Sequence, residues 1–307
     1  MRLRDIGENA LIERIRTRFP PPEGVLGIGD DAAIFDVPAG QSLVFCSDLV
    51  VEDTHFLRTL HPADAVGYKA VAVNVSDVGA MGGVPMYFLI SLAAPADVGL
   101  DWIDAFYDGV ERACRDFGVR LLGGDASAAD LILADVAMAG RVPQGAAVRR
   151  SGAQPGDGIY VTGALGASLW GLDLLRAGER DHPAVQRHLY PRPRHRIGAA
   201  VAAAAHAMID ISDGLSMDLW RIASASKVSA RIYKEKIPAA PGAPESHVLH
   251  GGEEYELIIA APVLPTGAEG VPITRIGEIA PSTAGNQVFL VEDNRESILH
   301  PGGWQHF

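Results

Sequence analysis

The sequence of 307 residues lacks the features that mark several common protein classes. Its two cysteines, Cys46 and Cys114, cannot build a disulfide framework, and no Cys-x-x-Cys pair suggests a zinc or redox site. It has four lysines, no basic run and a net charge of −12, so we expect no nucleic-acid partner and no membrane partner. No run approaches the length of a membrane span, and the N-terminus lacks the apolar stretch of a signal peptide. We therefore expect a cytoplasmic protein.

Familiar catalytic and nucleotide-binding motifs are also missing. There is no Gly-x-x-x-x-Gly-Lys-Ser/Thr loop, and Gly27-Ile28-Gly29 is not followed by the third glycine of a dinucleotide fingerprint. There is no Gly-x-Ser-x-Gly elbow, which disfavours acyl transfer. If phosphate groups bind to so lysine-poor a chain, then metal ions, backbone amides and arginines such as Arg149 and Arg150 must neutralise them.

The composition is that of an ordinary globular protein, with 48% hydrophobic and 21% charged residues. The length allows about two domains of roughly 150 residues. The segment 149–157 combines turn residues with two arginines and is the best boundary. We therefore expect an N-terminal domain over residues 1–147 and a C-terminal domain over residues 148–307.

Hydrophobic periodicity predicts an alternation of helices and strands, which is typical of an α/β or α+β fold. Expected helices cover 9–19, 63–80, 101–117, 166–176, 194–206 and 215–226. Expected strands cover 42–46, 86–93, 119–122, 131–141, 158–162, 208–211 and 255–260. This pattern puts Asp48 just after a strand and Gly123-Gly124-Asp125 at the end of another. Asp213 and Gly214 fall at a strand-to-helix turn, where backbone amides can hold an anion.

Five short acidic clusters stand out in the sequence. They are Gly27-Ile28-Gly29-Asp30-Asp31, Cys46-Ser47-Asp48, Asn74-Val75-Ser76-Asp77, Gly123-Gly124-Asp125 and Asp210-Ile211-Ser212-Asp213-Gly214. Carboxylates beside small residues suit Mg²⁺, which prefers oxygen ligands and shares phosphate oxygens with a substrate. The clusters therefore indicate Mg²⁺-phosphate chemistry.

Each cluster also has an ordinary structural interpretation. A lone Gly-Asp or Asp-Gly pair is more often a turn than a ligand. Asp77 lies among apolar residues, where an unpaired carboxylate would be costly to bury. A role as a metal ligand and a purely structural role are therefore equally consistent with its position. His55 alone reads as a polar surface residue, and Cys46 as a small buried hydrophobe. Trp304 and Phe307 could simply pin the tail to the second domain.

Seven motifs nevertheless occur in the order seen in the thiamine-monophosphate kinases, which the chain resembles from Gly27 to the C-terminus. They are Gly-Ile-Gly-Asp-Asp-Ala-Ala near residue 30, Ser47-Asp48 with His55-Phe56, Lys69-Ala70 through Asp77, Gly123-Gly124-Asp125, Arg150-Ser151-Gly152, Asp210 through Leu215, and Gly251-Gly252-Glu253-Glu254-Tyr255-Glu256-Leu257. The resemblance implies the two-domain fold of aminoimidazole ribonucleotide synthetase. It also implies a homodimer built on the N-terminal sheets.

The chemistry implied by the resemblance is transfer of the γ-phosphoryl group of ATP to thiamine monophosphate, assisted by several Mg²⁺ ions. The acceptor is already an anion, so no general base is expected, and charge neutralisation and alignment carry the catalysis.

Site residues follow from the resemblance motif by motif. Metal ligands would be Asp31, Cys46, Ser47, Asp48, Asp77, Asp125, Asp210 and Asp213. Contacts to ATP would come from Gly124, Asp125, Arg150 and Ser212, and contacts to thiamine monophosphate from His55, Glu253 and Trp304. Cys46 stands where relatives often carry Ser or Thr, and its backbone carbonyl could replace a side-chain oxygen there.

Other members of the same fold group fit less well. Selenophosphate synthetase needs a reactive residue near a Gly-rich N-terminus, and the hydrogenase maturation relative needs a C-terminal Cys. Neither feature is expected here. An enzyme of the aminoimidazole ribonucleotide synthetase type remains an alternative, as does a catalytically silent dimer that binds Mg²⁺ and nucleotide.

Overall fold

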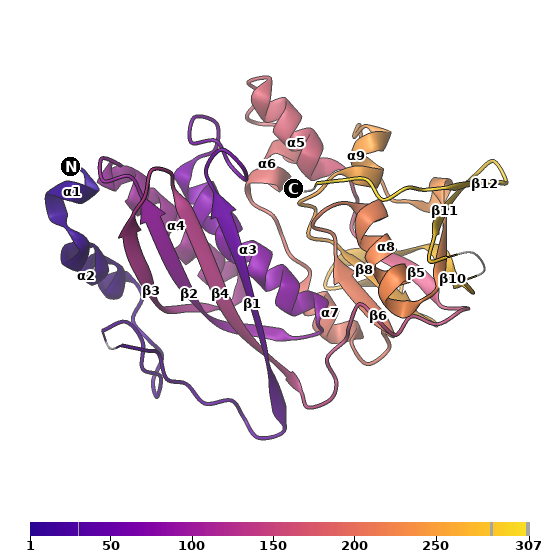
Figure 1. The fold of residues 1–307 in the computed structure, drawn as a ribbon, viewed down its shortest axis with the longest axis horizontal. Helices are drawn as coiled ribbons and strands as arrows, with labels where there is room; N and C mark the ends of the chain where they lie inside the picture. The colour runs from indigo at the N-terminus through magenta and orange to yellow at the C-terminus, as the bar shows by residue number, and fades with distance from the viewer. Residues whose placement is uncertain (30, 283–284, 305–307) are drawn as a thin grey trace. The chain divides into compact units, whose positions relative to one another are not determined.

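The structure is a computed structural model, and it describes residues 1–29, 31–282 and 285–304. The chain forms two compact units (Figure 1). The first unit comprises Met1–Val78 and Val84–Gln144, and the second comprises Gly79–Gly83 and the chain from Gly145 onward. In the part of the chain that the structure describes, no helix is both long enough and apolar enough to cross a bilayer.

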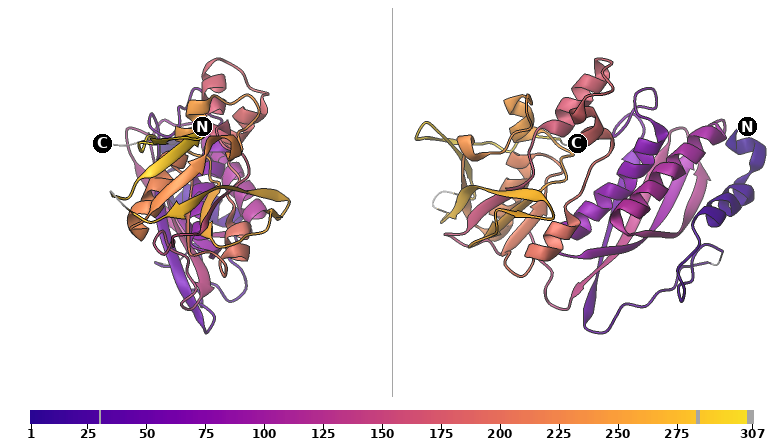
Figure 2. Two further views of the ribbon diagram at one scale, coloured as in Figure 1. Left: turned by 90° about the vertical axis from the view of Figure 1, so that its right-hand side faces the viewer. Right: turned by 180° about the vertical axis from the view of Figure 1, so that it is seen from behind.

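The first unit is built on a four-stranded sheet of order β1-β4-β2-β3. Its strands are β1 (Gln41–Val51), β2 (Val84–Ala94), β3 (Arg120–Ala128) and β4 (Leu133–Pro143). Strands β2 and β3 are parallel, and β4 is antiparallel to both β1 and β2. The helices are α1 (Leu3–Ile6), α2 (Glu8–Arg18), α3 (Ala63–Ala80) and α4 (Leu100–Phe117), and α3 and α4 cover one face of the sheet (Figure 2, right).

Helices α3 and α4 pack closely because glycines stand where they meet. A Cβ atom on Gly67 would lie 2.0 Å from the carbonyl oxygen of Phe106, and one on Gly109 would lie 1.8 Å from that of Asp64. Helix α4 is amphipathic and buries Phe106 among other residues, whereas α3 is buried on nearly every side. This explains why the sequence of α3 is dominated by Ala and Val.

The other face of the sheet exposes large apolar side chains. Along β1 they alternate with less exposed residues, as expected for a strand with one covered face. The most exposed is Phe45, at 65%. Leu43, Leu49, Val84 and Leu89 are also exposed. An exposed apolar surface of this kind is typical of a site of protein association.

The second unit holds an eight-stranded sheet of order β12-β11-β7-β10-β5-β8-β6, with β9 paired to β10. Its strands are β5 (Gly158–Thr162), β6 (Ala207–Asp210), β7 (Ser229–Tyr233), β8 (Leu257–Ala261), β9 (Gly267–Ala268), β10 (Val271–Ala280), β11 (Val288–Glu292) and β12 (Arg295–Ile298). Its helices are α5 (Ala167–Arg176), α6 (Pro183–Leu189), α7 (His195–Val201), α8 (Leu215–Ser226) and α9 (Glu245–His250), with a 3₁₀ turn at Lys234–Lys236.

Both faces of this second sheet are covered. On one face, Ile159 of β5 and Ile258 of β8 join a core that includes Leu219 of α8. On the other face, Tyr160 and Ile259 join a core that includes Ile197 of α7. Every residue of β5 and β8 is buried as a result, which accounts for their continuous apolar sequences.

The structure confirms the expected α/β architecture but corrects several element boundaries. Strand β1 continues to Val51, so Asp48 lies inside it rather than after it. Gly123-Gly124-Asp125 likewise lies within β3. Polar residues were taken as the ends of these strands, yet each strand continues beyond them, with Asp125 exposed and Asp48 half-buried. Helix α7 ends at Val201 and not at residue 206, and α1, α6, α9, β7 and β9 to β12 were missed.

Candidate functional site

The turn between β6 and α8 carries Asp210, Ser212 and Asp213, and a buried carboxylate organises it. One oxygen of Asp218, Oδ2, accepts hydrogen bonds from the backbone amides of Ser212, Asp213 and Gly214, at 3.0, 3.0 and 3.2 Å. We expected an anion at the amides of this turn, and the chain supplies one itself. Burial raises the pKa of Asp218 to about 7, while the backbone amides and Arg221 favour the carboxylate.

Arg221 links this buried carboxylate to a predicted metal ligand. It contacts Asp218 Oδ1 at 2.6 Å and Asp213 Oδ2 at 2.5 Å, while 30% of its side chain remains exposed. Asp210, at the end of β6, is buried. Asp213 is therefore partly neutralised by a cation of the protein, whereas Asp210 is held in the interior next to the same turn.

The Gly-Gly-Glu-Glu-Tyr-Glu segment runs beside this turn. The amide of Glu253 donates to the carbonyl of Ser212 at 2.8 Å, and the amide of Tyr255 donates to that of Ile211 at 2.9 Å. Glu253 and Tyr255 have φ values of 60° and 52°, which are uncommon for residues other than glycine. The Glu253 carboxylate lies 3.4 Å from Nδ1 of the buried His188. The segment thus brings a predicted substrate contact to the turn.

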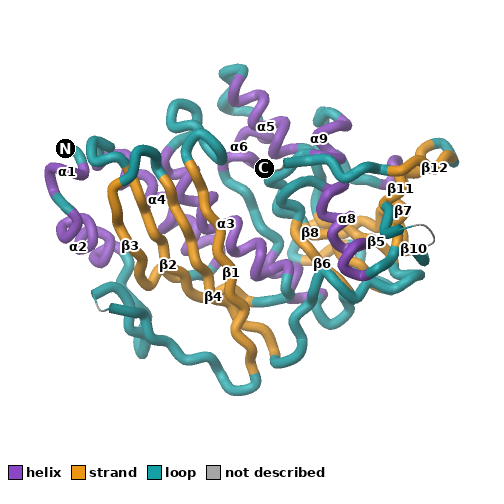
Figure 3. Tube along the Cα trace, in the orientation of Figure 1, coloured by secondary structure: helices purple, strands orange, loops and turns teal. Residues whose placement is uncertain are grey.

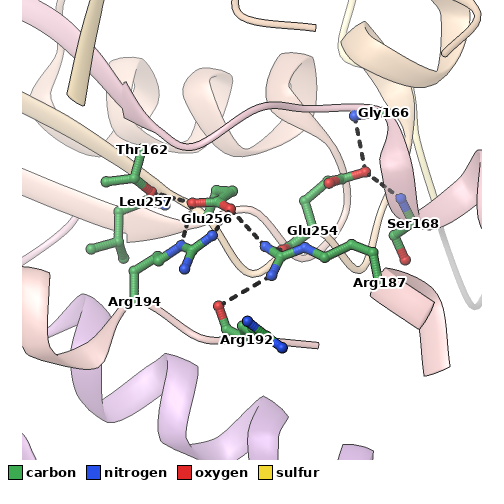
Figure 4. Close-up of polar contacts among 9 residues, drawn as sticks. All are labelled: Thr162, Gly166, Ser168, Arg187, Arg192, Arg194, Glu254, Glu256 and Leu257. Atoms are coloured by element: carbon green, nitrogen blue, oxygen red, sulfur yellow. Dashed lines mark hydrogen bonds and ion pairs between the residues drawn. The ribbon is translucent and has the colours of Figure 1, made fainter. Parts of the chain in front are cut away.

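A buried ionic cluster holds this segment in place (Figure 4). Glu256, 1% exposed at its side chain, receives two hydrogen bonds from Arg194, at 2.7 and 2.6 Å, and one from Arg187 at 2.6 Å. The hydroxyl of Thr162 donates to it at 2.6 Å. Burial lowers the pKa of Arg187, and Glu256 opposes that effect. Both arginines therefore form ion pairs with Glu256.

Glu254 points to a different part of the interior. Its Oε1 accepts the amides of Gly166 and Ser168 at 3.0 and 2.9 Å, which fixes the start of α5. Its Oε2 is buried and has no hydrogen-bond partner in the described part of the chain. Burial raises the pKa of Glu254 to about 7, although the hydrogen bonds from those two amides act to lower it.

The C-terminal segment also lies against the turn. A Cβ atom on Gly303 would fall 2.0 Å from the carbonyl oxygen of Asp213, so the tail backbone touches the turn there. Trp304 follows and is 51% exposed. The second unit thus gathers Ser212, Asp213, Glu253 and the approach to Trp304 around one turn. Phe307 lies outside the described residues.

In the first unit, Cys46 and Asp48 lie on the side of β1 that faces α3. The Cys46 sulfur is 3.6 Å from both the carbonyl and the side-chain oxygen of Asn74 on α3. Asp48, two residues along the strand, projects to the same face. Asp77 stands almost one helical turn after the buried Asn74 and is half-buried. These four residues lie in the layer between β1 and α3.

Ser47 projects from the opposite face of β1, so its side chain and that of Asp48 point apart. Its hydroxyl donates to Asp135 Oδ1 on β4 at 2.7 Å. Asp135, Ser91 and Asp125 are neighbours in the register of β4, β2 and β3. Sequence reasoning missed Asp135, although a lone carboxylate within an apolar strand was a possible signal.

The remaining predicted residues of the first unit occupy loops and one tight strand position. His55 accepts the amide of Val51 at its Nδ1, at 3.1 Å, and so braces the turn after β1. Asp31 is exposed in the loop segment between α2 and β1 (Figure 3), while Asp30 lies outside the described residues. At Gly124 a Cβ atom would be 1.7 Å from the Ile90 carbonyl, so only glycine fits there.

Arg150 follows the boundary between the units and belongs to the second. The hydroxyl of Ser226 donates to the Arg150 carbonyl at 3.2 Å and accepts the amides of Gly152 and Ala153 at 3.1 Å each. The backbone is thus fixed while the Arg150 side chain is exposed. Such an arrangement suits contact with an anion.

The predicted metal ligands are divided between the two units, with Asp210 and Asp213 in the second. Over the residues that the structure describes, no three His, Cys, Asp or Glu side chains form a ready metal cluster. Mg²⁺ commonly uses one or two carboxylates together with waters and substrate phosphates, so its binding does not require such a cluster. The donors are carboxylate oxygens, and their chemistry fits Mg²⁺.

Comparison with known families agrees with this architecture. Residues 29–142 match the N-terminal domain of AIR synthase related proteins, and residues 154–285 match the C-terminal domain of the same family. The chain is 38% identical to the thiamine-monophosphate kinase of Salmonella typhimurium over 98% of both chains, and 35% identical to that of Aquifex aeolicus over 100% of both. It therefore belongs to the thiamine-monophosphate kinase family within the AIR synthase related proteins.

Solved structures give the same result. The thiamine-monophosphate kinase of Stenotrophomonas maltophilia K279a superposes with a TM-score of 0.81 at 34% identity, covering 95% of this chain and 98% of that one. The structure described as AaThiL complexed with AMPPCP and TMP superposes with a TM-score of 0.79 at 34% identity, covering 100% and 99%. The resemblance drawn from the seven motifs is confirmed, as is the two-domain fold.

Proposed function

We propose that this chain transfers the γ-phosphoryl group of ATP to the phosphate of thiamine monophosphate, giving thiamine diphosphate and ADP. The observation that carries the proposal is its nearly full-length match to thiamine-monophosphate kinases, including the structure complexed with AMPPCP and TMP. The grouping of Ser212, Asp213 and Glu253 at one turn of the second unit supports it.

The proposed mechanism needs no general base, because the acceptor oxygen belongs to a phosphate that is already ionised. Bound Mg²⁺ would neutralise the charge of the two phosphate chains. The residues that would hold it are Asp31, Asp48, Asp77, Asp125, Asp210 and Asp213, with Cys46 and Ser47 contributing beside Asp48. The contribution of the chain is to hold these carboxylates and the two anions in alignment.

The proposed division of work assigns ATP, Mg²⁺ and dimer contacts to residues 1–147. Residues 148–307 complete the nucleotide and acceptor sites. Gly124, Asp125, Arg150 and Ser212 would contact ATP. Thiamine monophosphate would lie against His55, Glu253 and Trp304, where carboxylate and indole both attract the cationic thiazolium ring.

A single-turnover assay with ATP and thiamine monophosphate tests this function. Appearance of thiamine diphosphate with ADP supports it. ADP formation only with a formylglycinamidine-type substrate would favour the aminoimidazole ribonucleotide synthetase alternative, and nucleotide binding without turnover would favour a silent dimer.

We also propose a homodimer formed through the open face of the first sheet. Phe45, Leu43 and Leu49 present an apolar strip there, which a second copy of the same sheet would bury. Sedimentation analysis at micromolar concentration distinguishes this dimer from a monomer. A cytoplasmic setting suits the use of ATP and the thiol state of Cys46 and Cys114.

Replacing Arg150 by Ala is expected to raise the KM for ATP more than the KM for thiamine monophosphate. The Ser226 contacts involve only backbone atoms, so the loop should keep its shape when the guanidinium is removed. Steady-state kinetics with each substrate varied in turn measures the effect. Equal changes in the two KM values would instead assign Arg150 to the acceptor.

Replacing Trp304 by Ala is expected to weaken binding of thiamine monophosphate about 2- to 30-fold, which is the range of a cation–π contact. ATP affinity and the melting temperature should stay near those of the wild type, because half of the indole is exposed. Calorimetric titration measures both affinities. An unchanged acceptor affinity, or a large loss of thermal stability, would return Trp304 to a structural role.

A further inference from the structure

Residues 300–304 of the C-terminal segment are largely exposed, and polar contacts hold their backbone at Gly302. Leu299 is the last of the described residues that packs into the core of the second unit. Beyond it, His300, Pro301, Gly303 and Trp304 are all exposed. The backbone contacts of Gly302 therefore help to place Trp304, which follows two residues later.

Those contacts are made by one hydroxyl group on the first turn of α8. The Oγ of Ser216 donates to the carbonyl of Gly302 at 2.8 Å and accepts the amide of the same residue at 3.2 Å. His250 Nδ1, at the end of α9, lies 2.8 Å from the same oxygen. A hydroxyl has one proton and two lone pairs, so His250 must donate from Nδ1. With these contacts the hydrogen-bonding capacity of Ser216 is complete.

Two glycines allow the tail to come this close. A Cβ atom on Gly302 would lie 2.7 Å from Nδ1 of His250, and one on Gly303 would lie 2.0 Å from the carbonyl oxygen of Asp213. Gly303 also has a φ of 140°, which other residues rarely adopt. The tail is thus fitted to α8, α9 and the turn at the same point.

We propose that Ser216, supported by His250, is a positioning residue that latches the tail and thereby sets acceptor affinity through Trp304. The inference rests on the proposed function. Because residues 300–304 are largely exposed, releasing their contacts should cost little global stability. It should instead leave Trp304 free to leave the turn that carries Ser212 and Asp213.

The test is Ser216→Ala, which fits a helix and leaves the Gly302 backbone groups accessible to water. Hydrogen exchange in the C-terminal peptide should become about 10-fold faster or more. The KM for thiamine monophosphate should rise about 3- to 10-fold, the scale of one or two neutral hydrogen bonds, with the KM for ATP unchanged. Ser297→Ala on the exposed β12 is the matched control and should change neither quantity.

A double-mutant cycle separates this inference from the proposed role of Trp304 itself. If the latch acts through the indole, Ser216→Ala should add nothing in a Trp304→Ala background. Faster tail exchange with an unchanged KM for the acceptor would overturn the latch, and so would equal effects on both substrates. Gly303→Ala, which must displace the tail by steric conflict, should reproduce the Ser216→Ala kinetics. Failure of Trp304→Ala alone would count against the proposed acceptor site and not against the tail contact.

Discussion

Replacing Asp77 by Asn is expected to abolish phosphoryl transfer while the protein stays folded. The carboxamide has nearly the volume of the carboxylate, so the packing of α3 beside β1 should survive. The charge that would hold Mg²⁺ is lost, and we expect kcat to fall by about 10³-fold or more. Initial rates at saturating ATP measure the loss, and thermal unfolding followed by circular dichroism reports on the fold.

The matched control is Asp64→Asn, which makes the same substitution in the first turn of the same helix. Loss of an acidic residue there weakens the favourable interaction with the helix dipole, by about 0.3–1 kcal/mol, and should leave kcat nearly unchanged. Activity of Asp77→Asn within a few-fold of the wild type would remove Asp77 from the ligand set. A parallel loss in Asp64→Asn would show that the helix tolerates no such change.

Local sequence patterns predicted several elements at both of their ends. The helix at 215–226 and the strand at 158–162 match the structure at both ends. Helix 63–80 does so too, because an apolar segment of 18 residues is too long for a typical strand. Strand ends were less predictable, since Asp48 and Asp125 look like loop residues although both lie within strands.

The contacts that shape the site could not be predicted in this way. Glu256 pairs with Arg187 and Arg194, which lie 69 and 62 residues earlier in the chain, and nothing local marks the three as partners. Asp218 is only five residues from Asp213, yet its role depends on the turn folding back over the start of α8. The motifs identified the residues proposed to contact substrates. The residues that keep those side chains in position are recognised only from tertiary contacts.

The two neighbouring glutamates of the second unit should respond in opposite ways to the same substitution. Glu256→Gln removes the buried charge that compensates two largely buried arginines, so we expect a loss of about 3–5 kcal/mol in the free energy of unfolding. Urea titration at pH 8 measures it. A loss below about 1 kcal/mol would contradict the view that this ionic cluster holds the segment that carries Glu253.

Glu254→Gln is the internal control, because the charge of Glu254 destabilises the folded state near neutral pH. Burial raises the pKa of Glu254 to about 7 from 4.5, so the folded state binds its proton more tightly than the unfolded state does. The corresponding stability is fully present below pH 4.5 and is lost as the pH rises to about 7, a change of about 3 kcal/mol. Glutamine carries no such charge and keeps an oxygen for the amides of Gly166 and Ser168.

We therefore expect Glu254→Gln to flatten the dependence of the free energy of unfolding on pH between pH 4.5 and 7. The variant should be no less stable than the wild type at pH 8. An unchanged slope in urea titrations across that range would show that Glu254 stays ionised in the folded protein.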